Sequence, residues 1–252
     1  GNNVTGDRNT FFGDLAGHTN SSGDDNTYIG ASAGQANSGA GDDNTYIGSH
    51  AGYQHDGGSS NTAVGRSALN NIRKGSNSVA IGFEAGLYAT GSGNTFVGAD
   101  AGQGGTTSAP YSSGTNNVAV GYYAMRVFTT GYSNTVMGVN AGDAITTGYE
   151  NALFGQGAGG ALTDGHDNVM IGQIAGGNST SVGGAVIIGE FAGGSEDITD
   201  AADGVVLIGA GAGRYLTTGA YNLAIGSAAM ATHVTGHSNI AIGYRAMDDT
   251  DA

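Results

Sequence analysis

The chain is 252 residues long and carries 21 acidic against seven basic residues, for a formal net charge of −14. A chain this acidic repels nucleic-acid phosphates, so we expect no nucleic acid among its partners. It contains no cysteine, so disulfides contribute nothing to its stability. No apolar run approaches the ~18–20 residues that span a bilayer, so we expect no membrane insertion.

A glycine followed three residues later by an alanine recurs 14 times, and nine of the 13 spacings between these glycines are 17 residues. The repeat glycines are Gly13, Gly30, Gly48, Gly65, Gly82, Gly98, Gly121, Gly138, Gly155, Gly172, Gly189, Gly209, Gly226 and Gly243. This period predicts an all-β fold, a parallel β-solenoid (β-roll) of about 14 coils that bury their apolar faces on one another. We expect one repeat array over residues 1–252, and, because neither end has a capping unit, a longer parent chain.

Each coil is predicted to contain a short strand that ends just before its repeat glycine. The residue before the glycine is always apolar: Phe12, Ile29, Ile47, Val64, Ile81, Val97, Val120, Met137, Phe154, Ile171, Ile188, Ile208, Ile225 and Ile242. The residue three before it is Thr or Val in most coils. Because side chains alternate along a strand, these two positions share one face, which we assign to the interior.

The position between them points the opposite way but is also apolar in every coil. It holds Phe11, Tyr28, Tyr46, Ala63, Ala80, Phe96, Ala119, Val136, Leu153, Met170, Ile187, Leu207, Ala224 and Ala241. A strand that is apolar on both faces is normally buried on both faces. We therefore expect this column to pack on other chains in a closed homotrimer. The alternative is a wide single-chain solenoid with a second internal sheet.

Two further columns are predicted to shape the turns. Asn lies four residues before the glycine in 11 of 14 coils and is expected to form a ladder of stacked amides. A second glycine lies seven residues before the first in 12 coils, often after Thr-Thr, as at 128–131, 145–148 and 216–219. That segment predicts a second short strand closed by a turn with positive φ.

Paired aspartates at 24–25 and 42–43 fall at the same place in successive coils. Like charges stacked about 4.8 Å apart repel unless they are screened or bridged. We therefore predict plain solvated turns and no cofactor, and name Ca²⁺ at these turn aspartates as the alternative.

Two matches to enzyme motifs fall on repeat turns. Residues 30–34 fit G-x-S-x-G, and residues 155–160 fit G-x-G-x-x-G. Neither match has the helix that a nucleophile elbow or a dinucleotide site requires. The histidines show no recurring ligand spacing and no carboxylate pair stands out. We predict no catalytic, cofactor-binding or metal-binding residues, and hence no enzyme.

The period breaks twice, near residues 103–115 and 194–204. A solenoid accommodates insertions at its turns, where they project and commonly make contacts. We predict a receptor-contact loop with Thr106, Thr107, Pro110 and Tyr111, facing a cell-surface glycan or protein receptor. The alternative is a tolerated insertion without a role. The coils at Ala185 and Val205 lack the usual Asn and second glycine, which indicates a locally irregular zone.

The repeat pattern resembles known fibrous proteins. Asn-Ser-Val-Ala-Ile-Gly at 77–82 and the stretch 222–230 resemble the head repeats of trimeric autotransporter adhesins. The 17-residue period, with Thr-Thr-Gly before the next Asn, is closer to the tail-fibre shafts of phages and phage-like particles. The resemblance covers essentially the whole chain. It implies a trimeric parallel β-roll in an extracellular or virion-borne fibre that attaches to cell surfaces.

The sequence thus predicts a structural and host-attachment segment of a phage or phage-like tail fibre. A bacterial trimeric surface adhesin is the alternative within the same class. From other classes, we retain an ice-binding β-solenoid, since such folds can present flat Thr arrays, and a subunit of a self-polymerising extracellular filament.

Overall fold

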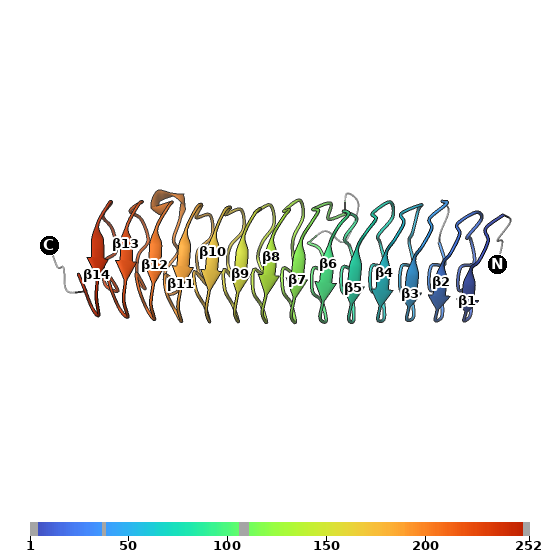
Figure 1. Cartoon of the computed structure of the whole chain (residues 1–252), viewed down its shortest axis with the longest axis horizontal. Coiled ribbons are helices and arrows are strands. Elements are labelled where there is room, and N and C mark those ends of the chain that lie inside the picture. The colour runs from blue at the N-terminus through green and yellow to red at the C-terminus, as the bar shows by residue number, and fades with distance from the viewer. Residues whose placement is uncertain (1–4, 37–38, 106–110, 249–252) are drawn as a thin grey trace. The chain divides into compact units, whose positions relative to one another are not determined.

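The computed structural model describes residues 5–36, 39–105 and 111–248. Each coil contributes one three-residue strand, and 14 strands lie in chain order in a single parallel sheet (Figure 1). The strands are β1 (Thr10–Phe12), β2 (Thr27–Ile29), β3 (Thr45–Ile47), β4 (Thr62–Val64), β5 (Val79–Ile81), β6 (Thr95–Val97), β7 (Val118–Val120), β8 (Thr135–Met137), β9 (Ala152–Phe154), β10 (Val169–Ile171), β11 (Val186–Ile188), β12 (Val206–Ile208), β13 (Leu223–Ile225) and β14 (Ile240–Ile242). The predicted all-β parallel solenoid is confirmed.

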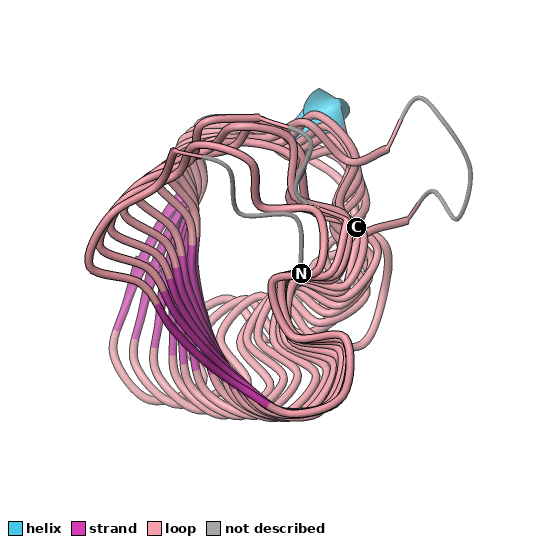
Figure 2. Cartoon of the chain, turned by 90° about the vertical axis from the view of Figure 1, so that its right-hand side faces the viewer, coloured by secondary structure: helices cyan, strands magenta, loops and turns pink. Residues whose placement is uncertain are grey.

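The chain forms two compact units, Gly1–Thr130 with β1–β7 and Gly131–Ala252 with β8–β14. Within each unit, equivalent residues of successive coils pair in register. Tyr28 lies opposite Tyr46 in the first unit, and Ile187 lies opposite Leu207 in the second. The strands occupy one side of each coil, and turns make up the remainder (Figure 2).

The face of the strand that points inward is the opposite of the one predicted. The middle residue of each strand is the buried one: Tyr28, Tyr46 and most others in this column are 0% exposed. The first and third residues face outward, so that Ile47 is 38% and Ile171 40% exposed. Alternation fixes which residues share a face but not which face is enclosed. The enclosing side is set by two other buried columns, the repeat alanines and the residue seven after the glycine.

Side-chain sizes inside the coil are matched between the middle strand residue and the residue four after the glycine. Nine large middle residues face a glycine: Phe11/Gly17, Tyr28/Gly34, Tyr46/Gly52, Phe96/Gly102, Val136/Gly142, Leu153/Gly159, Met170/Gly176, Ile187/Gly193 and Leu207/Gly213. Four middle alanines face a large residue: Ala63/Leu69, Ala119/Met125, Ala224/Met230 and Ala241/Met247. A Cβ on Gly34 would lie 2.6 Å from the Tyr28 ring, so each coil holds one large side chain at this point. The exception is the coil that pairs Ala80 with Gly86. Leu69 of the preceding coil lies beside Gly86 there, since a Cβ on Gly86 would be 2.8 Å from the Leu69 side chain.

The segment before the second glycine is not a strand, contrary to the prediction. Residues 128–131, 145–148 and 216–219 contain bends and no strand, and Phe128, Ile145 and Leu216 are buried in the core. Among the described second glycines, only Gly219 and Gly236 have positive φ, at 112° and 128°. Glycine is instead required by the close approach of the next coil. A Cβ on Gly148 would lie 2.6 Å from the carbonyl oxygen of Gly165.

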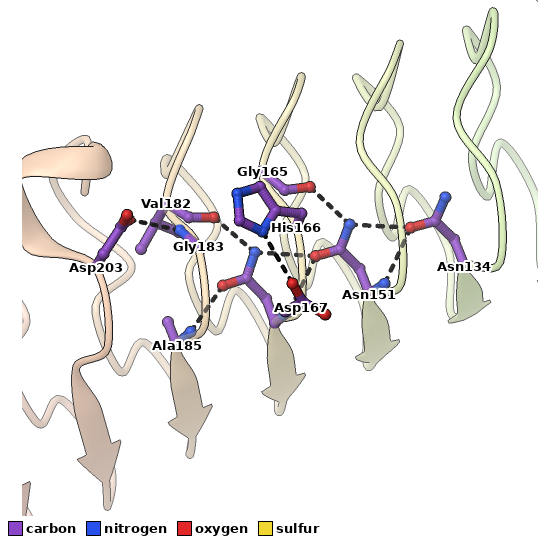
Figure 3. A network of polar contacts seen from close by, with 10 residues as sticks. Asn134, Asn151, Gly165, His166, Asp167, Val182, Gly183, Ala185 and Asp203 are labelled. Atoms are coloured by element: carbon purple, nitrogen blue, oxygen red, sulfur yellow. Dashed lines mark hydrogen bonds and ion pairs between the residues drawn. The ribbon is translucent and has the colours of Figure 1, made fainter.

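The predicted amide ladder is confirmed. In the second unit, Asn151 Nδ2 donates to Asn134 Oδ1 at 2.9 Å and to the Gly165 carbonyl at 2.8 Å (Figure 3). Asn168 repeats the pattern, and the ladder ends where the Ala185 backbone N–H donates to Asn168 Oδ1 at 2.9 Å. The ladder therefore satisfies buried backbone carbonyls that no strand reaches.

The second insertion, near 194–204, folds back onto the coil before it. It contains the 3-10 helix η1 (Asp200–Ala202) and buries Ile198 and Ala202 in the core. Asp203 Oδ1 accepts the Gly183 backbone N–H at 2.7 Å (Figure 3), and Asp197 Oδ1 accepts the Thr180 backbone N–H at 2.9 Å. These carboxylates replace turn contacts that the regular coils make, which accounts for the irregular zone expected there.

Candidate functional site

A surface feature that recurs in every coil is the outer sheet face, which we define as the first and third residues of all 14 strands. The third residue is apolar in every strand. Phe12, Ile81, Met137 and Ile242 are among those exposed by more than a third. Parallel strands are normally covered on both faces, so this half-exposed apolar column is unusual for an isolated chain.

The two units differ in the other column of the outer sheet face. In the first unit the first strand residue is Thr in five of seven strands: Thr10, Thr27, Thr45, Thr62 and Thr95. In the second unit only β8 begins with Thr, and the rest begin with Ala152, Val169, Val186, Val206, Leu223 and Ile240. The second unit therefore presents two apolar columns side by side, and the first presents one apolar and one hydroxyl column.

Of the predicted receptor-contact loop, Thr106, Thr107 and Pro110 lie outside the described residues. The Tyr111 ring stacks parallel to the Tyr88 ring, with centroids 6.2 Å apart. The Arg73 guanidinium lies 4.7 Å from the Tyr111 ring centroid, in cation–π geometry. Tyr111 is thus held by two neighbours, and its ring already has partners within the chain.

A shallow hollow lies beside this cluster. It has a volume of about 290 Å³ and is lined by Ala36, Tyr53, Gln54, Asp56 and Arg73. Arg73 Nη2 donates to Gln54 Oε1 at 3.2 Å across this hollow. The arrangement combines an aromatic wall with a fixed cation, a carboxylate and an amide, which suits a polar ligand.

The motif serine belongs to a turn that every coil repeats. Ser32 has φ +57° and is 9% exposed, and all 14 residues two after the repeat glycine have positive φ. The position therefore has a backbone role in the turn, and we retain the prediction that the chain is no enzyme. In the described part of the chain, no helix is long and apolar enough to cross a membrane.

Turn aspartates bond to the backbone of the preceding coil. Asp24 Oδ1 accepts the Asp7 N–H at 2.7 Å, and Asp42 Oδ1 accepts the Asp24 N–H at 2.8 Å. Within residues 5–36, 39–105 and 111–248, no group of three or more His, Asp or Glu side chains is placed to hold a metal ion. The prediction of solvated turns without a cofactor, and the alternative of Ca²⁺ at these aspartates, both stay untested.

Sequence reasoning missed the ring stacks that run between coils. Tyr132 stacks on Tyr149 with centroids 5.0 Å apart, and Tyr149 on His166 at 4.9 Å. The pKa of Tyr132 is raised, chiefly by desolvation and then by the nearby Glu150. The sequence does contain a pattern that indicates this stack, because the three residues lie 17 apart in one column of the repeat.

The first unit encloses one fully buried histidine, the only such histidine among the described residues. His55 hydrogen-bonds through Nε2 to the Gly58 carbonyl, while its Nδ1 atom has no partner. The Tyr46 ring lies edge-on to it at 5.6 Å. Burial lowers the pKa of His55 below its usual 6.5, outweighing the hydrogen bond that His55 donates to the Gly58 carbonyl and the charge of Asp56.

No family model matches the chain, and no curated protein matches it. The functional argument therefore depends on the repeat pattern, the solenoid fold and the surfaces described above.

Proposed function

We propose that this chain is a structural and host-attachment segment of an extracellular trimeric fibre, as in a phage or phage-like tail. The observation that carries the proposal is the apolar third column of the outer sheet face, which recurs in all 14 strands. The repeat resemblance to tail-fibre shafts and adhesin heads supports it. The predicted mode of attachment is non-covalent and multivalent, with avidity supplied by three chains.

The partner for this face is a second and a third copy of the same chain. Covering an Ile that is 40% exposed, such as Ile171, gains about 1 kcal/mol, and seven of the 14 third residues are exposed by 36% or more. A partner must offer apolar groups at the same strand spacing of about 4.8 Å, which another copy does. Three copies around one axis form a closed assembly in which each face is covered.

Light scattering on the purified chain, in low and high salt with and without Ca²⁺, tests the proposal. We expect a mass of three chains. Ile171→Lys combined with Ile188→Lys should lower the mass to one chain, because the lysines place charge in the contact. Gln173→Lys, an exposed turn position two residues after Ile171, is the matched control and should leave the trimer intact. A monomeric wild-type chain would overturn the proposal, as would equal loss of mass in the control.

A bacterial trimeric surface adhesin would use the same architecture, and electron microscopy of the native particle or cell surface distinguishes the two. Open-ended growth of the purified chain would instead indicate a self-polymerising filament.

One observation favours a second candidate function from another class, ice binding. The outward hydroxyl column occupies five of the seven strands of the first unit, β1–β4 in succession, with the apolar column beside it. Strand spacing of about 4.8 Å and a separation of about 6.7 Å along the strand give a flat two-dimensional lattice. Thermal hysteresis of the monomeric double-lysine variant and of the wild-type chain tests this function. Activity in either preparation would favour it over the fibre.

A further inference from the structure

The second unit contains an arginine held between two aromatic rings beside the 194–204 insertion. The Arg214 guanidinium lies 5.3 Å from the Phe191 ring centroid and 5.5 Å from that of Tyr215. Arg214 Nε donates to Ser195 Oγ at 2.8 Å, which fixes the plane of the guanidinium. The insertion thus supplies a group that locks the arginine, and the arginine in turn supports the Tyr215 ring.

Tyr215 is 40% exposed and forms a wall between two surface hollows, each of about 390 Å³. One hollow is lined by Glu196, Tyr215, Thr217, Thr232 and Val234. The other is lined chiefly by Glu190, Phe191, Arg214, Tyr215, Ala228 and Ala231.

The walls of both hollows are fixed by backbone hydrogen bonds between coils. The Tyr215 N–H donates to the Ala231 carbonyl at 3.1 Å, and the Thr217 N–H donates to the Val234 carbonyl at 3.0 Å. The hollows are therefore present before a ligand arrives, which reduces the entropy lost on binding.

Small residues create the second hollow. The two positions after the repeat glycine are Ala210 and Gly211 in one coil, and the next coil places Ala228 at the second of them. The equivalent positions after Gly121 are Tyr122 and Tyr123, whose rings stack with centroids 3.8 Å apart. Small residues at both positions are therefore not a general feature of the repeat.

We propose that Tyr215 and its two hollows bind a neutral saccharide. One sugar ring packs on Tyr215 in the hollow that Thr217 and Val234 line, and the next lies beside Arg214 and Phe191 in the other hollow. The inference rests on the proposed attachment function and names its ligand class. A pyranose has an apolar C–H face that suits an aromatic wall and hydroxyl donors that suit carboxylates on the rim. Glu190 and Glu196 supply the acceptors. These carboxylates and the net charge of −14 disfavour anionic sugars.

Calorimetric titration with a panel of neutral trisaccharides of glucose, galactose, mannose and N-acetylglucosamine tests the proposal, with trigalacturonate as the anionic comparator. We expect at least one neutral trisaccharide to bind, and trigalacturonate not to bind. Tyr215→Ala should reduce affinity at least tenfold, while Tyr221→Ala, a tyrosine 71% exposed that lines neither hollow, should leave it unchanged.

Ala228→Tyr fills the second hollow and should also reduce affinity at least tenfold. The variant is compatible with the fold, because Tyr123 occupies the equivalent position at φ +59° and Ala228 has φ +56°. Asn140→Tyr places the same side chain in the same column away from the hollows and is its control.

The proposal is overturned if no neutral trisaccharide binds, if trigalacturonate binds more tightly, or if Ala228→Tyr binds as the wild type does. Solution mass is read separately. Saccharide binding by a monomeric chain would support the saccharide site and contradict the trimer. A trimer that binds no sugar would contradict the saccharide site alone.

Discussion

The two units share one backbone plan but differ in both core and surface. The first unit stacks aromatic rings in its core, with Phe11, Tyr28 and Tyr46 at centroid distances of 5.0 Å, and presents a hydroxyl column outside. The second unit buries mainly aliphatic side chains, such as Leu153 and Ile187, and presents a second apolar column outside. The glycine, alanine and asparagine columns therefore fix the coil, and the strand residues vary freely so long as the volume inside each coil is conserved.

The largest expected effects test that conservation of volume. Tyr28→Ala should destabilise the first unit by about 3–5 kcal/mol, because it leaves a cavity. Adding Gly34→Leu should recover at least half of the loss, since the pair then copies Ala63 with Leu69, which has φ +47°. The free energy of unfolding in urea measures both variants.

The control for this prediction is Gly34→Leu alone, which should be destabilising because its Cβ would lie 2.6 Å from the Tyr28 ring. The same cycle in the second unit, Leu207→Ala with Gly213→Met, copies Ala224 with Met230 and should show coupling of the same sign. A double variant no more stable than Tyr28→Ala would contradict the volume rule.

The amide ladder gives the next largest effect. Asn151→Ala removes the acceptor for Asn168 and a donor to the Gly165 carbonyl, leaving buried polar groups unpaired at a cost of about 2–4 kcal/mol. Asn151→Ser should cost less, because in the first unit Ser78 occupies this column and its Oγ still accepts the Asn94 N–H at 3.3 Å. Thr147→Ala, at an exposed position that does not have positive φ, should be neutral in the same unfolding measurement. Equal losses for the Ser and Ala variants would show that the side-chain acceptor is dispensable.

The sequence was sufficient to predict the parallel solenoid, the strand positions and the Asn ladder, because each follows from a residue type that recurs at a fixed period. It did not determine the inward face, since both faces of each strand are apolar, as Tyr46 and Ile47 illustrate. The sequence also contains the size matching of Tyr28 with Gly34. It could not be interpreted as core packing, because the sequence does not show that both residues point inward. The Tyr215 hollows could not be predicted, because they depend on small residues in two neighbouring coils.

A pH dependence should distinguish the units at a smaller scale. His55 is buried and neutral in the folded first unit, and its pKa there is below the 6.5 of the unfolded chain. Between these two values the unfolded state binds the additional proton, so stability is lost as the pH falls through 6.5 toward the folded pKa. The loss is at most about 1.4 kcal/mol per pH unit for one group.

His55→Leu, which matches Leu162 and Leu216 in the same column, should flatten the profile of unfolding free energy between pH 8 and 4. An unchanged slope would assign the acid sensitivity to the carboxylates instead.

The smallest effects concern the first column of the outer sheet face. Val206→Thr with Leu223→Thr gives the second unit the surface of the first, and Thr45→Val with Thr62→Val does the reverse. If both units contact neighbouring chains, the first pair should weaken the trimer and the second strengthen it. Each site should contribute about 0.5–1 kcal/mol, or about two- to fivefold in the dissociation constant.

Sedimentation at a series of concentrations measures these shifts in the dissociation constant of the trimer. A response to the second-unit pair alone would confine the interchain contact to the apolar unit and leave the hydroxyl column of the first unit free for solvent. No response to either pair would contradict an interface on this face.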